Sequence, residues 1–123
     1  MLNTLLFQGI LVSDPNLTTD TRTDRPVVRF RLIGEGSKRI GQDGTVNFLF
    51  IAKEQIAEEF ASRFKQGDQV SVKATLEQRV YDDEQETVLY YATVRKILDN
   101  SADESIKKEL VDIVSTSNQR ILS

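Results

Sequence analysis

The chain has 123 residues, of which 39% are hydrophobic and 28% are charged, a composition typical of one soluble globular domain with a single core. It contains no cysteine and no histidine, which excludes disulfides, thiol nucleophiles and most zinc sites. The net charge of −3 argues against phosphate binding over the whole surface. We therefore expect no catalytic residue, no metal and no cofactor.

The N-terminus has neither the basic start nor the small-residue cleavage site of a secretory signal, and no apolar run is long enough to cross a membrane. We expect a cytoplasmic protein without membrane contact. Its charges are unevenly distributed. Residues 22–39 carry six basic and two acidic side chains, whereas residues 77–86 carry five acidic and one basic. One edge of the fold should therefore be basic and another acidic.

The first half of the chain reads as three strands. Apolar residues favour a strand over residues 4–12, which ends before the turn pair Asp14-Pro15. A second strand follows Pro26, and its side chains alternate with the period of two expected when only one face is buried. One face carries Val28, Phe30 and Leu32, and the other carries Val27, Arg29 and Arg31.

Residues 34–44 contain four glycines and predict a long hairpin loop, with Lys38 and Arg39 at its tip. A third strand over residues 46–52 is almost wholly apolar, so its two faces cannot be separated by pattern alone.

The period then changes to that of a helix. Ile56, Phe60 and Phe64 recur every fourth residue, and Gly67 is expected to end this helix. Alternation returns in a fourth strand, where Val70, Val72, Ala74 and Leu76 should face inward while Lys73, Thr75, Glu77, Arg79 and Tyr81 face outward. An acidic turn at residues 82–86 leads to a fifth strand over residues 87–98.

Five strands with one helix between the third and fourth favour a small closed barrel that the helix plugs at one end, although an α+β sandwich fits the pattern nearly as well. We assign residues 1–99 to this mainly all-β domain. Residues 100–123 form a C-terminal extension with a short helix, because a capping-box pattern at residues 101–104 precedes an apolar stripe. This helix packs either on its own barrel or on another subunit or partner.

The chain resembles the bacterial single-stranded DNA-binding protein family over residues 3–98. The segments that carry the resemblance are Asn3 to Leu11 with Asp14-Pro15, Pro26 to Leu32, Ile56 to Val70, and Leu76 to Tyr81. The resemblance implies a five-stranded OB-fold barrel and non-enzymatic, largely sequence-independent binding of single-stranded DNA through the face of the second and third strands. It also implies assembly into dimers or tetramers, and a role in replication, recombination, repair or plasmid and phage DNA processing.

The chain departs from the family in two respects. The family offers several aromatic rings to DNA, whereas this chain has no tryptophan, and our alignment puts Lys38 or Arg39, Asn47 and Lys53 at positions where the family favours aromatics. If Asn47 faces the nucleic acid, alternation sends Phe48 and Phe50 into the core. The family's acidic, Phe-tipped tail is absent as well, so we do not expect partner recruitment through such a tip.

We expect DNA binding led by charge, with Arg29 and Arg31 on the outward face of the second strand and Tyr81 as the one stacking ring. Tyr90 and Tyr91 point to opposite faces, and the pattern does not say which of them is exposed. The predicted DNA-binding residues are Arg29, Arg31, Lys38, Arg39, Asn47, Lys53, Lys73, Arg79 and Tyr81.

Two other functions compete with this one. The first is an OB-fold protein-interaction module of a primosome or conjugation complex, in which the acidic turn and the terminal helix matter most. The second and more distant is a carboxylate-dependent nuclease built from Asp82, Asp83 and Glu84.

Overall fold

In the computed structural model of the chain, the described residues are 1–36, 44–82 and 87–99, without the side chains of residues 81, 82 and 87. They form one helix and six strands, and the strands belong to a single, mainly antiparallel sheet. The elements in chain order are β1 (Leu5–Leu11), β2 (Asn16–Thr19), β3 (Pro26–Glu35), β4 (Thr45–Lys53), α1 (Glu54–Arg63), β5 (Gln69–Asp82) and β6 (Thr87–Leu98).

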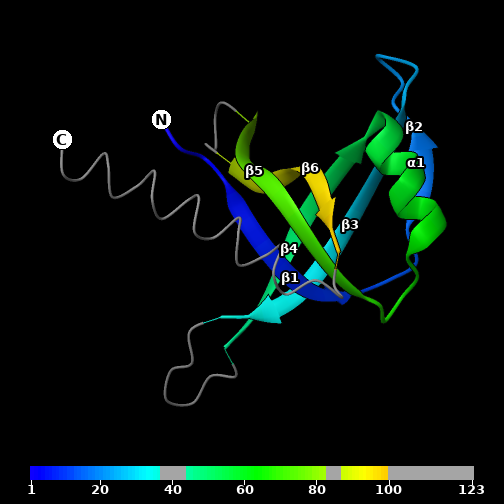
Figure 1. Ribbon diagram of the computed structural model, residues 1–123. Coiled ribbons are helices and arrows are strands. Elements are labelled where there is room, and N and C mark those ends of the chain that lie inside the picture. Colours follow the sequence, from blue (N-terminus) through cyan, green and yellow to red (C-terminus); the bar gives the residue numbers. More distant parts are fainter. Residues whose placement is uncertain (37–43, 83–86, 100–123) are drawn as a thin grey trace.

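The sheet closes on itself. Its strand order is β1-β5-β6-β4-β3-β2, and β1 pairs in addition with β3, so that five of the strands form a barrel (Figure 1). The contact between β4 and β6 is parallel, whereas the other pairings are antiparallel. The helix α1 lies between β4 and β5 in the chain and packs beside β2 and β3 (Figure 1). This arrangement confirms the predicted OB fold.

Two local features differ from the sequence-based expectation. The short strand β2 was not predicted, and it extends the edge of β3 with all four of its side chains exposed. The helix ends at Arg63, three residues before the expected end at Gln66, because Phe64 adopts an extended backbone and packs its ring 4.9 Å from the Phe60 ring. Burial of Phe64 thus outweighs one more helical turn, and Gly67 (φ 90°) serves the loop before β5 instead.

All six phenylalanines of the chain pack in or against the core, where they form a continuous set of ring contacts. Phe30 stacks between Phe60, at 4.0 Å between ring centroids, and Phe50, at 5.5 Å. Phe7 and Phe48 pack on Phe50 in tilted and edge-on geometry at 5.3 and 5.6 Å. Tilted and offset rings are the favourable arrangements for aromatic pairs, and their buried area makes them a large contribution to stability.

Closure of the barrel depends on two glycines where β1 crosses β3. A Cβ atom on Gly9 would lie 2.6 Å from the backbone oxygen of Ile33, and one on Gly34 would lie 2.6 Å from Cζ of Phe7. Both distances are far below van der Waals contact, so a side chain at Gly9 would push the two strands apart and one at Gly34 would displace the Phe7 ring. These glycines permit the pairing of Ile10 with Ile33 that closes the wall.

The β5–β6 hairpin extends beyond the closed part of the barrel. Val70, Val72 and Ala74 are buried as predicted, but Leu76 is 44% exposed, which corrects its assignment to the core. Leu76 points to the same side of β5 as those residues, yet it lies where the opposite wall of the barrel has ended. The acidic turn was predicted at residues 82–86, but the backbone of Asp82 ends β5. The rest of that turn, residues 83–86, and the predicted C-terminal helix lie outside the described residues.

Within the described residues, no helix is both long enough and apolar enough to cross a membrane.

Candidate nucleic-acid interface

The outer face of β3 and β4 combines basic and aliphatic side chains. In the antiparallel register Arg29 lies opposite Ile51, and Arg31 lies opposite Leu49. Residues directly opposite one another share a face, so these four side chains form two mixed rows. The next pairs in the same register are Val27 with Lys53 and Ile33 with Asn47. The inner face of the same strands carries the buried Phe30 and Phe50, so alternation separates the core from this surface.

A broad open groove, about 690 Å³ in volume, runs over this outer face and onto the β5–β6 hairpin. Four aliphatic side chains line it among polar and charged ones. Lining residues come from the β2–β3 turn, from β3, from β4 and from the hairpin. They are Asp20, Thr21, Arg22, Val27, Arg29, Leu49, Ile51, Lys53, Arg79, Leu89 and Tyr91.

Cations dominate the charge of the groove. Among the described lining residues, Asp20 carries the one carboxylate, and the cations are Arg22, Arg29, Lys53 and Arg79. Arg31 extends the cationic row along β3, two residues and about 6.8 Å beyond Arg29. A groove with this excess of positive charge attracts a polyanion although the chain as a whole is acidic.

Asp20 is held in the turn between β2 and β3. The backbone N–H of Arg22 donates to its carboxylate at 2.9 Å, and this hydrogen bond is the main cause that lowers the pKa of Asp20 below its ordinary value. The positive charges of Arg22, Arg29 and Lys53 act in the same direction. The carboxylate is therefore ionised at neutral pH and adds a negative charge to one end of the groove.

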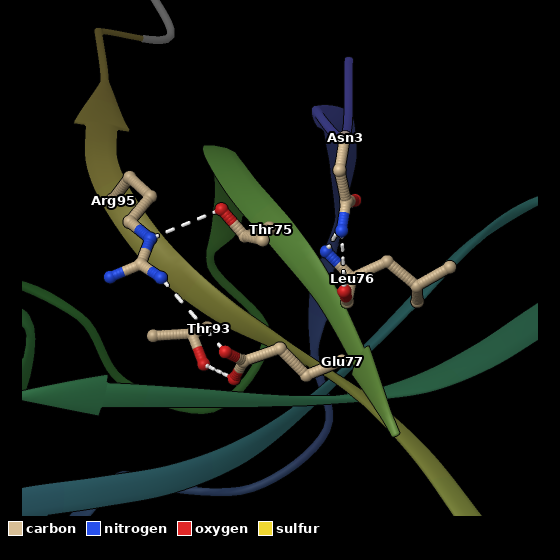
Figure 2. Close-up of polar contacts among 6 residues, drawn as sticks. All are labelled: Asn3, Thr75, Leu76, Glu77, Thr93 and Arg95. Atoms are coloured by element: carbon tan, nitrogen blue, oxygen red, sulfur yellow. Dashed lines mark hydrogen bonds and ion pairs between the residues drawn. The ribbon is translucent and has the colours of Figure 1, made fainter. Parts of the chain in front are cut away.

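A polar network continues the outer face across β5 and β6, next to the groove (Figure 2). The hydroxyl of Thr93 donates to the carboxylate of Glu77, and Nη2 of Arg95 lies 4.0 Å from the same carboxylate. Nε of Arg95 also donates to the hydroxyl of Thr75 at 3.1 Å. Glu77 lies opposite Tyr91 in the ladder, so this network borders the Tyr91 ring. It places the positive charge of Arg95 beside the Glu77 carboxylate.

The Asn3 side chain, two residues before β1, hydrogen-bonds to the backbone of β5. Its amide donates to the backbone oxygen of Leu76 at 2.8 Å and accepts from the backbone N–H of Leu76 at 3.1 Å (Figure 2). The Asn3 amide thereby bonds both backbone groups of Leu76, as a neighbouring strand would. It continues the β1–β5 ladder beyond its first pair, Leu5 with Ala74.

The structure brings together several of the predicted site residues. Arg29, Lys53 and Arg79 line one groove, and Arg31 and Asn47 lie on the same outer face of the β3–β4 pair. Phe48 and Phe50 point inward, as the placement of Asn47 on the outer face requires.

The other predicted residues are not part of this surface as described. Lys73 lies on β5 between Leu6 and Lys96, six residues and about 20 Å along the strand from Arg79, and it does not line the groove. Lys38 and Arg39 lie outside the described residues. Tyr81 belongs to β5, but its side chain is outside the described part.

Sequence reasoning missed the aliphatic side chains and the tyrosine ring that line the groove. Leu49 and Ile51 follow from alternation once Asn47 is placed outward, but the pattern of an apolar strand left that placement open. Tyr91 is half-buried and lines the groove, whereas Tyr90 is 55% exposed on the opposite face of β6. The pattern put the two tyrosines on opposite faces without saying which face met the groove. Arg22 belongs to the basic stretch at residues 22–39, but no pattern placed it at the site, and Asp20 gave no signal because it lies in a turn.

Among the described residues, no group of three or more acidic side chains lies close enough to hold a metal ion.

Three comparisons with known proteins address the chain's relationships. The model of the single-strand binding protein family matches residues 2–99. The SSB domain of a protein from Synechococcus sp. has a similar structure, with a TM-score of 0.60 and 16% sequence identity over 80% of this chain and 97% of that one. At this identity the likeness shows the fold alone. No curated protein sequence matches the chain.

Proposed function

Because the chain belongs to the single-strand binding protein family, we propose that it binds single-stranded DNA along the groove of β3, β4 and the β5–β6 hairpin, with little sequence preference. The observation that carries the proposal is that Arg29, Lys53 and Arg79 line one groove together with aliphatic side chains. Cations contact phosphates whatever the DNA sequence, so the affinity should depend little on sequence and strongly on salt.

The groove's apolar part fits unpaired bases. Leu49, Ile51 and Leu89 offer a surface against which bases lose contact with water, and Tyr91 offers a ring on which one base can stack. A duplex hides its bases, so it would gain only the phosphate contacts. The groove therefore supports a preference for single strands. It also supports a protein without enzymatic activity, since binding of this kind needs no reacting group.

We also propose that the chain acts in the cytoplasm as a homo-oligomer, a dimer or a tetramer, and serves a DNA process such as replication or repair. An apolar patch supports the oligomer. Leu76, Val80 and Tyr90 lie on one face of the hairpin and are 44%, 50% and 55% exposed. Patches of this kind on a stable protein mark contact surfaces. Light scattering on the full chain checks the mass.

The test of binding is a titration of labelled oligo-dT and of the matching duplex over a salt series. We expect saturable binding to the single strand at low salt and weaker binding to the duplex. Replacing Arg29 and Arg31 together by alanine should weaken oligo-dT binding at least tenfold at low salt and flatten the slope of log Kd against log salt by about 1.4, at about 0.7 per lost contact.

The control is the double variant R63A/K65A, which removes the same charge at the end of α1, away from the groove. It should bind like the unaltered chain. If oligo-dT does not bind at low salt, the proposed function is wrong. If both double variants weaken binding equally, the DNA lies on another face. Cleavage of the oligonucleotide that depends on added magnesium would indicate the carboxylate-dependent nuclease instead.

A further inference from the structure

We propose that Asp20 is a built-in competitor of the DNA phosphates: its carboxylate occupies, among the groove's own cations, a position that a phosphate would otherwise take. This inference rests on the proposed function, and it concerns how tightly the groove binds rather than whether it binds. The effect is to hold affinity below what the cations alone would give.

The first argument is position. Asp20 lines the same groove as Arg22, Arg29 and Lys53, and it is the only carboxylate among the described lining residues. Arg29 and Lys53 are also among the cations that should contact phosphates. A carboxylate near such cations lowers the electrostatic potential that a phosphate meets, and it repels the phosphate directly.

The second argument is that the position is fixed. The backbone N–H of Asp20 donates to the oxygen of Arg25 at 2.8 Å, and the oxygen of Asp20 accepts from the N–H of Asp24 at 2.8 Å. The side chain itself accepts from the N–H of Arg22 at 2.9 Å. The carboxylate therefore cannot turn away when DNA arrives without losing a hydrogen bond. A fixed anion competes more effectively than a mobile one.

The third argument is that the charge persists. The Arg22 hydrogen bond and the neighbouring cations lower the pKa of Asp20, so the carboxylate stays ionised throughout the pH range in which binding is measured. A turn alone would not need this charge, since an asparagine side chain also accepts a hydrogen bond from a backbone N–H two residues later. The turn and the charge can thus be separated by a single substitution.

The experiment compares Asp20→Asn with Asp24→Asn. Both variants remove one negative charge from the same loop, and the amide oxygen that D20N introduces can still accept the hydrogen bond from the Arg22 N–H. Asp24 does not line the groove. Its backbone φ of 56° lies in the left-handed region, which asparagine tolerates well, so the control should keep its fold. Thermal melting of both variants checks this.

We expect D20N to bind oligo-dT about threefold to tenfold more tightly at low salt, and the gain to shrink as salt screens the charges. The affinity of D24N for oligo-dT should stay within about twofold of that of the unaltered chain. The same gain should appear with an oligonucleotide that has abasic sugars, because phosphate competition does not involve the bases.

Unchanged or weaker oligo-dT binding by D20N, with the unaltered chain still binding, would overturn the inference while leaving the proposed function intact. A gain confined to strands with bases would also overturn it, because Asp20 would then act on bases. Equal gains in D20N and D24N would indicate a general charge effect and would equally overturn it. If D20N melts early, Asp20→Ser provides a second variant that keeps an acceptor for the turn. Failure of the unaltered chain to bind would count against the proposed function alone.

Discussion

The two faces of the β3–β4 pair differ as much as any two regions of the molecule, although they are built from alternate residues of the same strands. The inner face carries Phe30 and Phe50 in a set of packed rings, while the outer face carries Arg29, Arg31 and Lys53 over Leu49 and Ile51. All six phenylalanines pack in or against the core, and among the described side chains Tyr91 is the ring that lines the groove.

This difference shows how a binding surface can change while the barrel beneath it persists. Stability comes from the inner residues, because burial of rings removes large apolar areas from water. The proposed binding depends on the outer residues, because cations and a half-buried ring remain available to a ligand. Substitutions on one face should therefore leave the property of the other face nearly intact.

The largest expected effect is on the inner face. Phe30→Ala leaves a cavity between Phe50 and Phe60 and should lower the free energy of unfolding by about 3–5 kcal/mol. Urea denaturation measures this change, and oligo-dT binding by the folded fraction should stay within about twofold. The neighbouring outward substitution Arg31→Ala should change stability by less than about 0.5 kcal/mol. Comparable losses of stability in the two variants would mean that the faces are not independent.

The next effect sharpens the role of the ring in the groove. Tyr91→Ala should weaken oligo-dT binding about tenfold, since stacking of a base contributes about 1–3 kcal/mol. The slope against salt should stay unchanged, because no charge is lost. Tyr90→Ala is the matched control, since Tyr90 lies on the opposite face of β6. Because Tyr90 belongs to the patch proposed for the oligomer, light scattering checks that both variants keep the mass of the unaltered chain. A titration in which the two variants bind alike would remove Tyr91 from the binding surface.

The smallest effect concerns the polar network beside the groove. Thr93 is 4% exposed and its hydroxyl donates to Glu77, so Thr93→Val leaves that carboxylate with one partner fewer and should cost about 1 kcal/mol of stability. Thr75→Val, which removes a hydroxyl that accepts from the exposed Arg95, should cost less. Melting temperatures distinguish them, and a larger loss for T75V would contradict the contacts in Figure 2.

Much of the barrel could be predicted from the sequence. The period of two in residues 26–32 separated the two faces of β3, and the period of four at Ile56, Phe60 and Phe64 identified α1. Local patterns suffice where one face of an element is buried and the other is not. They failed at the end of α1, where long-range packing of Phe64 decided the backbone, and at Leu76, which continues an inward pattern beyond the barrel wall.

The groove was only partly predictable. The sequence by itself determined that Arg29 and Arg31 share an outward face, because alternation along one strand fixes direction. Only the tertiary structure decided that Arg79, Lys53, Tyr91 and Asp20 meet there, since they come from a hairpin, a strand end and a turn that lie far apart in the chain. Periodicity describes each strand separately, whereas a groove depends on register between strands and on which strands become neighbours when the barrel closes.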